Sequence, residues 1–97
     1  MEKLNFEYPT SGKKPQRFHV GVVGSGDLEI LLEPSKDANA HVTIQTSVAG
    51  FAGTWKAVLD RFFESYEDAA NLDIHDFGAT PGTVALRLQQ AVEGSRS

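Results

Sequence analysis

The chain has 97 residues, of which 40% are hydrophobic and 23% charged, a composition typical of one small globular domain over residues 1–97. It contains no cysteine, which excludes disulfide bonds, thiolate nucleophiles and iron–sulfur clusters. The formal net charge of −4 argues against nucleic acid as a partner, because that binding depends on neutralising phosphates. The sequence has no apolar signal core and no membrane-spanning stretch, so we expect a cytoplasmic protein without a membrane partner.

Alternating apolar and polar residues predict β-strands in the first half of the chain. Residues 4–9 are predicted to form the first strand. Residues 17–33 are predicted to form a hairpin whose turn contains the Gly-Ser-Gly triplet at 24–26. Residues 41–48 are rich in β-branched side chains and alternate again, which predicts a further hairpin strand.

The apolar period then changes to that of helices. Residues 54–67 carry apolar side chains at helical spacing, with Thr54 as the expected N-cap. A short strand follows at 72–77, and a second helix is expected with Thr80 as N-cap and Pro81 at its first position. This order predicts an α+β fold, a mostly antiparallel sheet of about five strands with two helices packed on one face.

Ser25 stands between Gly24 and Gly26 in the expected hairpin turn, and Asp27 follows. Glycines supply the positive φ of a tight turn and serine bonds to nearby backbone, so a purely structural turn accounts for the pattern. The pattern also suits a covalent attachment site, because two glycines give a modifying enzyme clearance around an exposed hydroxyl. In that case, the carboxylate of Asp27 would orient the hydroxyl or help to hold a cation.

Other chemistries of a glycine-flanked serine fit less well. Dinucleotide and phosphate-binding loops need a helix after the glycines, whereas the next residues alternate as in a strand. A hydrolytic serine needs glycines two positions away on each side, where this chain has Val23 and Asp27. The candidate bases, which are also the candidate metal ligands, are spread over three predicted strands. They are His19, His41 and His75.

Three segments carry a resemblance to a known family: VGVVGSGDLEILLEP, TSVAGFAGTW and IHDFGATPGTVALRLQQA. They resemble the acyl carrier (delta) subunits of bacterial malonate decarboxylases, and the resemblance extends over residues 3–93. The serine turn and the IHDFGATPG segment are its most specific parts. The strand-rich pattern departs from the four-helix bundle of fatty-acid carriers, so we do not expect that fold.

The resemblance implies a non-catalytic carrier. Ser25, flanked by Gly24, Gly26 and Asp27, would carry 2'-(5''-phosphoribosyl)-3'-dephospho-CoA through a phosphodiester. The thiol of this group would hold acetyl and malonyl thioesters in turn. The implied partners are decarboxylase subunits, an acyltransferase subunit and the transferase that attaches the prosthetic group.

An alternative function from another class stays open, a small regulatory or scaffolding module that binds an anion at the glycine turn. A second anion site is conceivable at residues 76–82, where the second helix offers the backbone N–H groups of Thr80, Gly82 and Thr83. An ordinary capped helix is the simpler interpretation of that segment.

Overall fold

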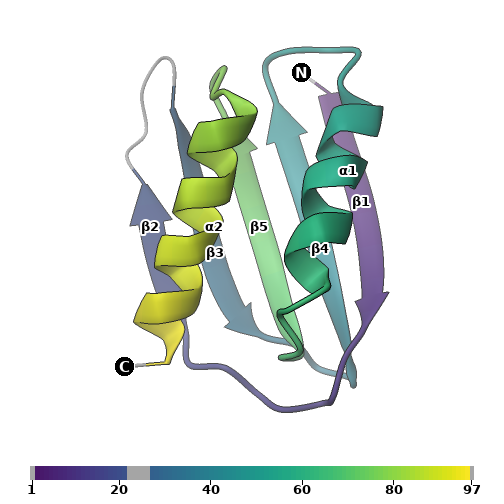
Figure 1. The fold of residues 1–97 in the computed structure, drawn as a ribbon, viewed down its shortest axis with the longest axis vertical. Helices are drawn as coiled ribbons and strands as arrows, with labels where there is room; N and C mark the ends of the chain where they lie inside the picture. Colours follow the sequence, from purple (N-terminus) through teal and green to yellow (C-terminus); the bar gives the residue numbers. More distant parts are fainter. Residues whose placement is uncertain (1, 22–26, 97) are drawn as a thin grey trace.

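A computed structural model describes residues 2–21 and 27–96 of the chain, and within them one sheet is covered on one face by two helices (Figure 1). The strands are β1 (Glu2–Pro9), β2 (Phe18–Gly21), β3 (Leu28–Pro34), β4 (Asn39–Thr46) and β5 (Ala70–Asp76). The helices are α1 (Ala52–Phe63) and α2 (Pro81–Ser95). The mixed sheet is mostly antiparallel, which confirms the predicted α+β fold with helices on one face.

The neighbours of β4 differ from the prediction. The sheet has the order β1-β4-β5-β3-β2, so β4 pairs antiparallel with β1 and parallel with β5. The predicted hairpin with the preceding strand is therefore wrong, because β5 lies between β3 and β4. A parallel pair needs a crossover connection, which α1 provides between β4 and β5. Alternation identifies a strand but carries no information about its neighbour.

The core lies between the sheet and the helices. Its strand residues follow the period of two, since only one face of the sheet is covered. Each buried Leu or Ile contributes about 1.5–3 kcal/mol through removal of apolar surface from water. The fully or almost fully buried strand side chains are Leu28, Ile30, Leu32, Val42, Ile44, Leu72 and Ile74. From the helices, Trp55, Leu59, Val84, Leu88, Ala91 and Val92 complete this core.

The two helices begin in different ways. In α2, Thr80 is the N-cap and its Oγ1 accepts a hydrogen bond from the Thr83 N–H at 3.2 Å, as predicted. In α1 the N-cap is Phe51, which makes no side-chain capping bond, so the prediction of Thr54 is wrong. Trp55, four residues after Phe51, is buried, so packing rather than a side-chain cap supports the first turn of this helix. Neither helix, as far as its residues are described, is long and apolar enough to cross a membrane.

Candidate functional site at the turn end of the sheet

The sheet has one end, here called the turn end, at which β2, β4 and β5 finish and β3 begins. Ser25, Gly24 and Gly26 lie outside the described residues, so the structure defines this site by the residues on either side. On the β2 side, Gly21 has a φ of +100°, and a Cβ there would lie 2.2 Å from the Leu28 carbonyl oxygen. Only glycine therefore fits where β2 ends.

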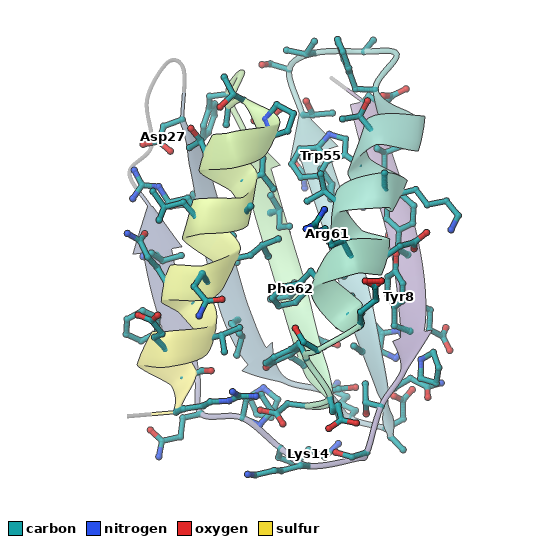
Figure 2. The ribbon with its side chains drawn as sticks, viewed as in Figure 1. Tyr8, Lys14, Asp27, Trp55, Arg61 and Phe62 are labelled. Carbon is teal, nitrogen blue, oxygen red and sulfur yellow. The ribbon has the colours of Figure 1, made fainter. Side chains whose placement is uncertain are left out.

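On the other side, Asp27 is tied to α2 by an ion pair (Figure 2). The Nη2 of Arg87 lies 2.8 Å from Oδ2 of Asp27, and its Nε lies 3.2 Å from Oδ1. The Leu28 N–H donates to Oδ1 at 2.7 Å, and the Phe77 N–H donates to the Asp27 carbonyl oxygen at 2.8 Å. Asp27 is thus held by β3, by α2 and by the residue that follows β5.

These contacts also set the charge state of Asp27. Hydrogen bonds from Arg87 and from the Leu28 N–H lower the pKa of the Asp27 carboxyl below its ordinary value. Both carboxylate oxygens are occupied by donors of the chain itself, which favours an anchoring role over cation binding. The sequence predicted Asp27 as a site residue but did not indicate Arg87, which lies 60 positions away.

Asp76 forms a second polar centre at the turn end and was missed by the sequence reasoning. Its carboxylate is 4% exposed, and Oδ2 accepts a hydrogen bond from Oγ1 of Thr46 at 2.8 Å. Oδ1 accepts from the N–H groups of Gly78 at 3.2 Å and Ala79 at 2.9 Å. The signal in the sequence is its place two residues after Ile74, where the alternation requires an inward side chain.

This network bears on the anion site considered at residues 76–82. The N–H groups of Gly78 and Ala79 are taken by the carboxylate of Asp76, and the N–H of Thr83 is taken by Thr80. The chain therefore supplies acceptors for part of this segment, and Thr80 acts as an ordinary helix N-cap.

The histidines lie on three strands as predicted, and their side chains stand beside carboxylates. His19 and His75 flank Glu29, with ring nitrogens 2.9 Å and 3.7 Å from its carboxylate oxygens, and His41 lies 3.0 Å from Asp37. Spacing did not indicate the first grouping, which arises because β3 lies between β2 and β5. Within residues 2–21 and 27–96, no group of three ligand side chains is arranged to hold a metal ion.

The comparisons with known proteins agree with this architecture. The structure matches a chain of the "crystal structure of a Pseudomonas malonate decarboxylase hetero-tetramer in complex with malonate" with a TM-score of 0.91 and 48% identity, covering 97% of this chain and 98% of that chain. The fold is thus that of a malonate decarboxylase component.

Sequence comparison specifies which component. Residues 15–95 match the family model of the malonate decarboxylase delta subunit. A malonate decarboxylase acyl carrier protein of Azotobacter vinelandii is 52% identical, and one of Pseudomonas fluorescens is 50% identical; each alignment covers 96% of this chain and 95% of the relative. The chain belongs to the malonate decarboxylase delta subunit family, which confirms the resemblance seen in the sequence.

Proposed function

We propose that this chain is the acyl carrier subunit of a malonate decarboxylase and that Ser25 is its attachment residue. The observation that carries the proposal is the identity of about half the residues, over nearly full length, with proteins named malonate decarboxylase acyl carrier protein. The glycine-flanked serine lies between two positions, Gly21 and Asp27, that the rest of the fold holds firmly.

The prosthetic group proposed is 2'-(5''-phosphoribosyl)-3'-dephospho-CoA, joined to Ser25 by a phosphodiester with Gly24 and Gly26 beside it. When bound, the group supplies the thiol that holds acetyl and malonyl as thioesters. The residues of this chain fit that role, because a protein without cysteine has no thiol of its own. Asp27, paired with Arg87, fixes the chain where the turn rejoins β3 and so limits the directions in which an attached arm extends.

The chemistry in this proposal belongs to other subunits. Decarboxylase subunits, an acyltransferase subunit and the transferase that attaches the group each bring an active site to the carrier. Tethering the acyl group raises its effective concentration at successive active sites. The similarity to a chain of a hetero-tetramer supports a carrier that works inside an assembly.

The test is the intact mass of protein made in a host that contains the attaching transferase. We expect an increment of one prosthetic group in the wild type, its loss in Ser25→Ala, and its retention in Ser47→Ala. Ser47 is a matched control, since it is an exposed serine at the same end of the sheet. An unmodified wild-type chain that still binds its complex would instead favour the alternative, a regulatory module that binds an anion.

A further inference from the structure

A cavity of about 410 Å³ lies between the first turns of α1 and α2, at the turn end of the sheet. Its walls are mainly apolar, and Figure 2 shows Trp55 projecting from α1 toward the space between the helices. Two of its side chains are large hydrophobic groups that stay exposed, Phe51 at 49% and Val48 at 38%. The apolar side chains of the lining are those of Val48, Phe51, Trp55, Val58, Ala79, Pro81 and Val84. This size and lining are typical of small-molecule sites.

The polar part of the lining favours a neutral ligand. Asp76 and Thr46 contribute the buried polar groups, and the lining contains no lysine, arginine or histidine. The oxygens of Asp76 already accept hydrogen bonds from the chain, so the carboxylate needs no cation from a ligand. A second carboxylate in this cavity would lose its hydration beside a like charge, which is unfavourable.

The segment that lines the cavity is hydrogen-bonded to Asp27, which follows the proposed attachment residues in the sequence. Residues Asp76, Gly78 and Ala79 line the cavity, and within this same segment the N–H of Phe77 bonds to the Asp27 carbonyl oxygen. In the sheet, Leu28 pairs directly with Asp76. Asp27, two positions after the proposed attachment residue in the sequence, thus contacts a segment that lines the cavity.

We propose that this cavity holds the acetyl-thioester end of the prosthetic arm between reactions and excludes the malonyl form. This inference rests on the proposed carrier function. The methyl group and the thioester pack against the apolar wall around Trp55, whereas the free carboxylate of malonyl is repelled by Asp76 and lacks a cation. The acetyl form is shielded from water, and the malonyl form stays available to a decarboxylating partner.

The first test uses the modified protein carrying a ¹³C-labelled acetyl thioester. Trp55 is the only tryptophan in the chain, so its indole N–H gives a single NMR signal that reports on the cavity. We expect nuclear Overhauser contacts from the acetyl methyl to Trp55 and Val58, and a shift of the indole signal between the thiol and acetyl forms. The malonyl form should return the signal to its position in the thiol form.

The second test fills the cavity with Val58→Phe and uses Ala57→Phe as the matched control, because Ala57 is exposed on the same helix. The acetyl thioester should hydrolyse roughly threefold more slowly on the wild type than on acetyl-CoA, as expected for occupancy of about two thirds. Val58→Phe should abolish this protection, and Ala57→Phe should keep it.

Two outcomes separate this inference from the proposed function. If intact mass shows the prosthetic group but the acetyl methyl makes no contact with Trp55, or malonyl gives the same shift, the cavity proposal is overturned and the carrier proposal stands. The cavity proposal is also overturned if Val58→Phe weakens binding to the partner subunits without changing the thioester lifetime, because the apolar residues around the cavity then form a protein-docking surface. A wild type without any mass increment removes both proposals together.

Discussion

The two ends of the sheet are built differently. At the end opposite the turn, the segment between β1 and β2 runs across the strand ends and is tied to them (Figure 1). Lys14 donates to the carbonyl oxygens of Ser35 and Asp37, and the Ala69 N–H donates to the Lys13 carbonyl oxygen at 2.7 Å. Figure 2 shows Lys14 in this position.

The turn end has a different construction, with side-chain polar centres at Asp27 and Asp76 and an apolar cavity beside them. At the opposite end, Lys14 and backbone groups tie the connecting segment to the strand ends, whereas at the turn end an apolar cavity lies between the helices. The turn end therefore combines the proposed carrier site with contacts that stabilise the fold, and the predictions below test which of its residues serve each role.

The largest expected effect is on activity and comes from Ser25→Ala. In a reconstituted complex this change should abolish malonate decarboxylation, because no arm can be attached. The free energy of unfolding should change by no more than about 0.5 kcal/mol, as for most surface substitutions. Steady-state turnover and urea unfolding of the same preparations measure both quantities. Loss of activity together with a large loss of stability would instead show that Ser25 also supports the fold.

The next effect is on stability and compares two glycines with positive φ, one at each end. In Gly21→Ala the new Cβ would lie 2.2 Å from the Leu28 carbonyl oxygen, whereas in Gly12→Ala it would meet only the Ala38 Cβ at 3.9 Å. Both variants carry backbone strain, but the first must also displace β3, so it should cost about 1–3 kcal/mol more. Urea unfolding of the two variants gives the difference, and equal costs would refute the close approach at Gly21.

The sequence predicted the strands and helices well because burial of one face imposes its period on each element. Leu72 and Ile74 in β5, for example, alternate with outward residues and lie in the core. What the sequence did not predict depends on contacts between distant segments. The place of β5 beside β4 brings Asp76 to Thr46, and the packing of α2 on β3 brings Arg87 to Asp27; no local pattern encodes either contact.

The cavity was missed for the same reason. Residues 46–58 and 76–84 supply its walls, and they meet because α1 crosses from β4 to β5 and α2 then packs beside it. The aromatic stripe of residues 54–67 is typical of core packing, which is correct for Trp55 in α1 and for Tyr66 just after it. The first turn of α1 has a second role that helical spacing alone does not indicate.

A smaller effect is expected from breaking the anchor at the turn end with Arg87→Met. The pKa of Asp27 is lowered in the folded protein, so the ion pair contributes stability above the unfolded pKa of 3.8 and loses it as the pH falls through the folded value. The variant should therefore be less stable at pH 7, and its stability should depend less on pH below about 4. Urea unfolding at several pH values measures this dependence.

The control for this experiment is Arg17→Met, which removes an exposed pair with Glu33 whose side chains are 68% and 41% exposed. Exposed ion pairs contribute little to the free energy of unfolding, so the stability of this control should depend on pH as that of the wild type does. If Arg87→Met and Arg17→Met behave alike, Arg87 does not anchor the turn end.

The smallest expected effect is on the pKa values of two carboxyl groups, one at each end of the sheet, which are lowered by different hydrogen-bond donors. At the opposite end, Asp37 has its pKa lowered to about 2, first by the backbone N–H of Asn39 and then by His41. A backbone donor survives side-chain substitution, so His41→Gln should leave the pKa of Asp37 well below 3.8.

The pKa of Asp27 should instead rise toward 3.8 in Arg87→Met, because the largest cause of its lowered pKa is the hydrogen bond from the Arg87 side chain. ¹³C NMR titration of both carboxyls measures this contrast, and a return of Asp37 to its ordinary pKa in His41→Gln would show that side chains, not backbone, set the charge at both ends.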